Sequence, residues 1–225
     1  MIFWGWNSKK KKNNEQISKS NPIEKIEIKE EIEWTELETF INQFADTKPN
    51  LESGKNTIIK FIQENFPSFK SDFMTELDFD AIKNEFIDWL KVPLLKSPPE
   101  KEIVAYYFGL FTSSDPQLSE SGEEIKVLYI AGSKTTPEQD SIDWAVDPDY
   151  FPPERYCILN SYTQIEKELS KYKNTSDLEQ ILFNGITNLI LVNSMDELKQ
   201  NSNKSGMYVG SGFDSGPCFL IGKTE

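Results

Sequence analysis

The sequence predicts an α+β protein, with N-terminal helices followed by a mostly antiparallel sheet on which one or two helices pack. Two observations support this fold class. Apolar residues recur at a spacing of three and four between residues 37 and 90, whereas continuous apolar runs bounded by turn residues dominate from residue 103 onward. The hydrophobic share of 37% in 225 residues is enough for a folded core, which argues against disorder along the whole chain.

Residues 1–22 hold five lysines and one glutamate and are predicted to form a flexible basic tail. The apolar residues of this segment precede its lysines, the reverse of a secretory signal, and are too few to span a membrane. We therefore expect a cytoplasmic protein without stable membrane insertion. Contact of Trp4, Trp6 and the neighbouring lysines with an anionic membrane surface stays open as an alternative.

The remaining residues, 23–225, are predicted to form a single α+β domain made of a helical half, 23–98, and a sheet-rich half, 99–225. The alternating isoleucines of residues 26–34 fit either a short strand or a helical stripe. The first helix is expected to begin at a capping box in which Thr35 accepts from a backbone amide and Glu38 reaches back.

Two more helices follow in the helical half. One carries apolar residues over 58–66 and ends at Pro67. The other begins near Asp78 or Asp80 and is expected to stop at Pro93.

Residues 96–102, KSPPEKE, break the pattern between the two halves. Ile103 to Phe111 then predicts a central strand, because the run is too apolar to face water on one side. Val127 to Ala131 is expected to pair with it across the polar segment 113–124, and Tyr156 to Leu159 to form a third strand.

The C-terminal part is expected to alternate helices and strands. Ser161 is predicted to cap a helix that contains Ile165 and Leu169. The further predictions are a helix over 177–183, a buried strand over 187–192, a helical turn over 195–199, and a hairpin of 207–213 with 218–221.

A long acidic and aromatic loop between the strands at residues 127 and 159 is the first candidate site. Aromatic side chains supply interface energy while carboxylates steer a partner, so this mixture favours a docking surface for a basic protein. A solvated loop, a cation site and a loop whose tryptophan only plugs the core stay open as alternatives. The candidate contact residues are Asp140, Asp143, Trp144, Asp147, Asp149 and Tyr150.

Charge and composition limit the classes of function. The net charge is −13, and the chain beyond residue 22 carries −17, from 19 basic and 36 acidic residues. A field of this sign repels phosphate backbones and favours basic partners, so nucleic-acid binding is disfavoured. There is no histidine and a single arginine, Arg155, which removes the histidine-based catalytic dyads and a broad arginine anion site. We therefore expect a protein without a catalytic site or a cofactor.

Two alternatives from other classes remain. Asp and Glu with magnesium need no histidine, and Glu124-Ile125-Lys126 weakly matches the Glu-x-Lys of some nucleases, which keeps a metal-dependent hydrolase open. A structural or interaction domain of unknown partner is the second alternative. Cys157 and Cys218 lie within apolar runs and are interpreted as buried structural thiols.

The order of an acidic helical half, a YFGLF strand, a LYIAGSK strand, a DWAVDPDYFPPERY loop and a terminal YVGSGFDSG hairpin resembles bacterial immunity proteins, including those of the SUKH type. The resemblance covers about residues 103–222. It implies binding to a cognate toxin domain in the cytoplasm, with no chemistry. Because such toxins are often nucleases with basic clefts, an acidic surface is what inhibition would require.

Overall fold

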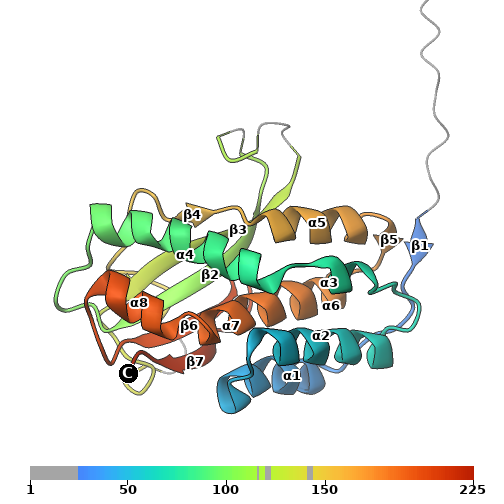
Figure 1. Cartoon of the computed structure of the whole chain (residues 1–225), viewed down its shortest axis with the longest axis horizontal. Helices are drawn as coiled ribbons and strands as arrows, with labels where there is room; N and C mark the ends of the chain where they lie inside the picture. The colour runs from blue at the N-terminus through green and yellow to red at the C-terminus, as the bar shows by residue number, and fades with distance from the viewer. Residues whose placement is uncertain (1–24, 116, 120–122, 141–143) are drawn as a thin grey trace, which may run out of the picture.

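The computed structural model describes residues 25–115, 117–119, 123–140 and 144–225 (Figure 1). The predicted basic tail lies outside these residues. The first element is the short strand β1, Ile26–Glu27, which pairs in parallel with β5, Tyr172–Lys173, to form a separate two-stranded sheet. Within the ambiguous stretch 26–34, only Ile26–Glu27 form a strand, and Trp34 begins the first helix.

The helical half contains α1 (Trp34–Thr47), α2 (Leu51–Asn65), α3 (Phe73–Glu76) and α4 (Phe79–Lys96). Its predicted apolar faces are buried. The predicted capping box is wrong, because Glu33 occupies the N-cap without a side-chain bond and Thr35 already lies inside α1.

The sequence predicted the beginning of α4 correctly and its end incorrectly. Asp78 caps the helix as expected, accepting from the Ala81 amide at 3.0 Å. Pro93 does not end α4 but lies inside its last turn. A proline so close to the C-terminal end removes one hydrogen bond without stopping the remaining residues from staying helical.

The main sheet has five strands in the order β4-β3-β2-β6-β7. The strands β2 (Ala105–Ser113) and β3 (Ile125–Ser133) form its centre, with β4 (Tyr156–Cys157) at one edge and the hairpin of β6 (Tyr208–Phe213) and β7 (Phe219–Lys223) at the other. Every neighbouring pair is antiparallel except β2 and β6, which are parallel. The predicted mostly antiparallel α+β fold is confirmed.

The later helices are α5 (Asn160–Leu169), α6 (Ser176–Glu179), the π-helical turn η1 (Gln180–Asn184), α7 (Gly185–Val192) and α8 (Met195–Ser202). The buried strand predicted for residues 187–192 is wrong, since these residues form α7. A short apolar run does not distinguish a buried strand from a helix that is buried on all sides. Ser161 does not cap α5 either, because it lies within the helix with a buried hydroxyl that has no hydrogen-bond partner.

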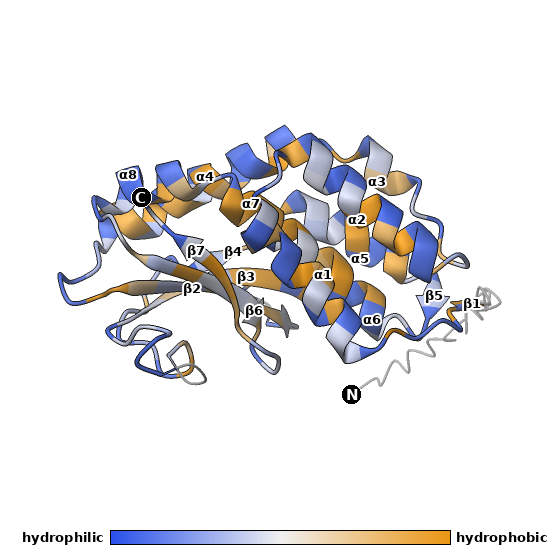
Figure 2. Ribbon diagram, turned by 90° about the horizontal axis from the view of Figure 1, so that it is seen from below, coloured by the Kyte–Doolittle hydropathy of each residue, from blue (hydrophilic) through white to orange (hydrophobic). Residues whose placement is uncertain are grey.

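The helices cover one face of the main sheet, and the central loop lies against the other (Figure 2). Alternate residues of β2, such as Tyr106 and Phe108, point into a large core shared with the helices. This core also holds residues of α1, α2 and α4, so the helical and sheet-rich halves are packed together. On the helix-free face, Tyr107 contributes to a smaller apolar cluster with Trp144 and Tyr208.

Candidate partner-binding surface

Two aromatic residues of the central loop hold the loop to the sheet. Trp144 is 3% exposed, and its ring lies edge-on to that of Tyr107 with the centroids 6.4 Å apart. Tyr150 is 9% exposed, bridges to Gly132 through the backbone, and donates its hydroxyl to the Ser97 carbonyl at 2.7 Å. The placement of these two rings on a contact surface is therefore corrected, because both are part of the packed interior.

The approach of Trp144 to the sheet depends on a glycine. A Cβ atom at Gly210 of β6 would lie 2.7 Å from the indole ring, closer than side chains tolerate. The glycine-rich stretch of the C-terminal hairpin thus makes room for the tryptophan of a loop more than 60 residues earlier in the chain. The loop is consequently held against the helix-free face by a contact that local sequence does not reveal.

The carboxylates of the loop remain on its outside. Asp140, Asp147 and Asp149 are exposed, and Asp149 accepts from the Lys134 amide at 2.8 Å. Asp143 lies outside the described residues. Two apolar side chains share this surface, with Val146 64% and Phe151 47% exposed. The loop therefore presents apolar groups among carboxylates, although the aromatic ring on its surface is that of Phe151.

Four rings form a second feature, which we term the aromatic patch: Phe111 of β2, Tyr129 of β3, Phe151 of the loop and Tyr156 of β4. The ring centroids of Phe111 lie 5.9 Å from Tyr129 and 5.6 Å from Tyr156, and those of Tyr129 and Phe151 lie 5.8 Å apart. Tyr129 and Tyr156 are direct partners in the β3–β4 register. The patch lies on the helix-free face, because its strand residues alternate with those that enter the large core.

Tyr129 lies across the centre of the sheet and is held at both ends. A Cβ atom at Gly109 would lie 2.2 Å from the Tyr129 ring, so the ring occupies the space left by this glycine. The Tyr129 hydroxyl donates to the Asp214 carboxylate at 2.6 Å. Burial raises the pKa of both the Tyr129 hydroxyl and the Asp214 carboxyl, and the hydrogen bond partly opposes this rise for Asp214.

Arg155 packs against two rings of the aromatic patch. Its guanidinium carbon lies 3.9 Å from the ring centroid of Phe151 and 4.5 Å from that of Tyr156. The same group donates to the Pro152 carbonyl and to the Tyr156 hydroxyl. The sole arginine of the chain thus orders the aromatic rings around it.

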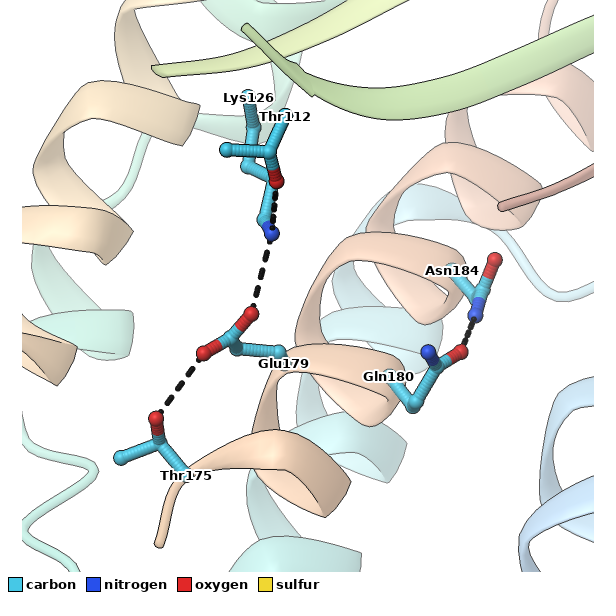
Figure 3. Close-up of polar contacts among 6 residues, drawn as sticks. All are labelled: Thr112, Lys126, Thr175, Glu179, Gln180 and Asn184. Carbon is cyan, nitrogen blue, oxygen red and sulfur yellow. Dashed lines mark hydrogen bonds and ion pairs between the residues drawn. The ribbon is translucent and has the colours of Figure 1, made fainter. Parts of the chain in front are cut away.

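A polar groove lies at the end of the sheet where β2 finishes and β3 begins, and Figure 3 shows the side-chain contacts on one side of it. The buried Lys126 ammonium lies 2.7 Å from the Thr112 hydroxyl and 3.0 Å from the Glu179 carboxylate. Glu179 also accepts from the Thr175 hydroxyl at 2.9 Å. The chain of contacts joins the central strands to α6 and fixes this side of the groove.

The groove has a volume of about 340 Å³, and its charged lining consists of the carboxylates of Glu124, Glu166 and Glu179 and the ammonium groups of Lys25 and Lys126. Burial raises the pKa of the Glu166 carboxyl, and the charges of Glu179 and Glu124 add to this rise. Lys126 opposes the rise through its charge and its backbone amide. Glu124 and Lys126, which are two residues apart in the sequence, therefore line the same groove.

The described part of the chain contains neither a cluster of side chains that could hold a metal ion nor an activated thiol. No three Asp, Glu or Cys side chains there come together in a way that could hold a metal ion. Cys157 and Cys218 are both free thiols, and burial raises the pKa of Cys218 to about 12. This keeps the thiol protonated at neutral pH, the opposite of an activated nucleophile.

The aromatic patch and the Lys126 contacts were not predicted from the sequence. Phe111, Tyr129 and Tyr156 come from three strands, and only the register of the sheet brings their rings together. Side chains of a strand alternate between the two faces of a sheet, so Phe111 and Tyr129 could have been assigned to a common face, but the continuous apolar character of both runs hides which face is covered by helices. Lys126 and Glu179 are 53 residues apart, so no local pattern marks their pairing.

The chain matches no family model, no curated protein and no solved structure. In the part of the chain that the structure describes, no helix combines the length and the apolar composition needed to cross a membrane.

Proposed function

We propose that this protein acts by binding a basic protein partner in the cytoplasm, and that the partner is a toxin domain which the binding neutralises. The observation that supports the proposal is the surface of the central loop. Val146 and Phe151 are exposed there among the carboxylates of Asp140, Asp147 and Asp149. Apolar side chains in a polar, charged surround are typical of a protein contact site.

The loop that bears this surface is anchored before any partner arrives. Trp144 and Tyr150 hold residues 144–150 of the loop against the helix-free face of the sheet, and the backbone of Tyr150 pairs with Gly132. A fixed loop loses little conformational entropy on binding, so more of the contact energy contributes to affinity.

Charge supports a basic partner. Residues 25–225 contain 19 basic and 35 acidic residues, a net charge of −16. Such a field accelerates encounter with a basic surface and weakens as salt is added. Occlusion of a basic cleft by an acidic surface is sufficient to inhibit a nuclease without any chemistry by the inhibitor.

The test uses the full chain and a purified basic nuclease toxin domain, with the dissociation constant and association rate measured at low and high salt. Changing Asp140, Asp143, Asp147 and Asp149 together to asparagine is expected to slow association at low salt and to flatten its salt dependence. An Asn at position 149 still accepts from the Lys134 amide, so the loop keeps this contact. Binding with unchanged salt dependence would contradict the assignment of the loop surface.

Single substitutions of two aromatic residues distinguish a loss of partner contact from a loss of stability. Phe151→Ala is expected to accelerate dissociation, because this ring is exposed. Trp144→Ala is expected to lower stability instead, because its ring is buried.

A carboxylate-based hydrolase is the second candidate, and the polar groove is the observation that favours it. Glu124, Lys126, Glu166 and Glu179 line this one hollow. Saturable binding of magnesium or manganese in calorimetry, lost in Glu166→Gln, would support this candidate over the first. The structural or interaction domain at a membrane depends on residues 1–14, which lie outside the described part of the chain, and predicts liposome binding that is lost on their deletion.

A further inference from the structure

We propose that the aromatic patch on the helix-free face of the sheet is the anchor site for the basic partner, and that the acidic central loop steers the partner toward it. This inference rests on the proposed function and adds where the binding energy is concentrated. The occupant is a surface of the partner protein that presents lysine or arginine side chains.

The face that bears the patch is left uncovered by the helices. Among the described residues, the helices lie on the opposite side of the main sheet and the central loop covers part of this side (Figure 2). Phe111, Tyr129 and Tyr156 are half-buried and Phe151 is exposed, so each ring retains surface for a partner. Rings of this kind lie at the centre of many protein interfaces, where they account for much of the binding energy.

The rings are held in place in the free protein. Tyr129 contacts Phe111 and Phe151, rests over Gly109 and donates to Asp214, so its rotation is restricted at both ends. Arg155 stacks on Phe151 and Tyr156 and thereby fixes the other side of the patch. Rigid aromatic side chains lose little entropy on binding.

The charges around the patch select a basic occupant. The Asp214 carboxylate, which accepts from Tyr129, lies at the edge of the patch, and residues 25–225 carry a net charge of −16. Arg155, the cation within the patch, is engaged by two rings and by the Tyr156 hydroxyl. Cations are also attracted to the faces of aromatic rings, so the rings and the negative charge both favour a basic partner.

A hollow beside Phe111 gives a cationic side chain a place to enter. Its volume is about 340 Å³, and its lining includes the Phe111 ring, the Asp214 carboxylate and the ion pair of Lys126 with Glu179. It shares Thr112, Lys126 and Glu179 with the polar groove, so the patch continues into the carboxylate-lined end of the sheet. A lysine or arginine from the partner would there meet an aromatic wall and carboxylates together.

The experiment measures binding of a purified basic nuclease toxin domain to the full chain and to the variants Phe111→Ala and Tyr156→Ala. We expect the dissociation constant to rise about tenfold or more in each variant, mainly through faster dissociation. Leu95→Ala is the matched control, because Leu95 is an equally apolar, exposed residue on α4. This control is expected to bind within about twofold of the wild type.

Because both rings also contact neighbours within the sheet, circular dichroism and the more conservative Phe111→Leu variant check that a loss of affinity is not a loss of folding. A folded Phe111→Leu variant with intermediate affinity supports the anchor role. Reduced hydrogen exchange over residues 105–113 and 125–133 in the complex would support it independently.

Four results would overturn the inference. If the wild type binds the toxin domain and the patch variants bind equally well, the patch is not the anchor, although the proposed function stands. If the wild type does not bind the toxin domain, the proposed function fails, and the inference with it. If oligolysine binds the wild type and the variants equally well, and the toxin domain binds no more tightly than oligolysine, then charge alone determines binding. A dimer in sedimentation analysis that is lost in Phe111→Ala would assign the patch to a second copy of this chain.

Discussion

At the scale of single residues, Lys126 shows how a buried charge is accommodated in an acidic protein. Its ammonium contacts the Thr112 hydroxyl and the Glu179 carboxylate and lies 5.5 and 5.3 Å from the ring centroids of Phe183 and Phe213. Removal of one partner from such a pair leaves the other charge partly desolvated, which costs more than the pair itself contributes. Lys126 compensates the charge of the neighbouring Glu166 only in part, through its own charge and its backbone amide, and burial still raises the pKa of the Glu166 carboxyl.

Glu166 gives a pH-dependent prediction for stability. Because its pKa is raised in the folded state, the folded protein binds more protons than the unfolded chain between the ordinary glutamate pKa and the raised value. The contribution of Glu166 to the free energy of unfolding therefore falls as the pH rises through this window. Glu166→Gln is expected to be more stable than the wild type at pH 7.

The advantage of Glu166→Gln should disappear below the ordinary glutamate pKa of about 4.3, where the wild-type side chain is protonated in both states. Urea unfolding of the two proteins at neutral and acidic pH measures the difference. Glu168→Gln, a change on the same helix at a carboxylate that is paired with Lys171, is the control and is expected to give no such gain. A lower stability of Glu166→Gln at pH 7 would show that attraction to Lys126 outweighs burial.

At the scale of the elements, the close approach of α2 and α7 determines how the helical half meets the rest. Gly54 lies in α2, and a Cβ atom there would lie 2.3 Å from a methyl carbon of Leu189 in α7. Leu189 is fully buried, so its side chain has little space to move. The glycine is thus needed for packing, although it lowers the intrinsic helix propensity of α2.

Gly54→Ala is therefore expected to destabilise the protein by about 1–3 kcal/mol, although alanine favours a helix by about 1 kcal/mol over glycine. Urea unfolding followed by circular dichroism measures the change. The double variant Gly54→Ala with Leu189→Val should lose less stability than the two single changes added together, because the smaller side chain relieves the contact. Additive losses would contradict the steric explanation.

At the scale of the whole molecule, one large core joins the helical and sheet-rich halves. It includes Phe44 of α1, Phe86 of α4 and Phe108 of β2, while α1 and α2 both pack on α7. The break at residues 96–102 therefore connects two parts that share their apolar interior. Parts with a common core are expected to unfold together.

We expect a single urea transition with the same midpoint by circular dichroism and by tryptophan fluorescence. Trp34 and Trp89 lie in α1 and α4 and Trp144 lies against the sheet, so Trp144→Phe keeps the fluorophores of the helical half and the double variant Trp34→Phe/Trp89→Phe keeps the fluorophore of the sheet-rich half. The fluorescence and circular dichroism midpoints should coincide within each variant, even where the substitution shifts both. Separate midpoints for the two probes would indicate two folding units.

The sequence by itself determined the fold class, the apolar faces of the N-terminal helices, the β2–β3 pairing and the C-terminal hairpin, because each rests on a periodicity or a turn within a short segment. It also determined the acidic character that favours a basic partner. The helical state of residues 185–192, the burial of Trp144 and Tyr150, and the assembly of the aromatic patch were decided only by the tertiary structure. The physical reason is the same in each case: an apolar run or ring does not specify what covers it. That depends on glycines, strand register and side chains far away in the chain, as the contacts of Gly210 with Trp144 and of Tyr129 with Asp214 show.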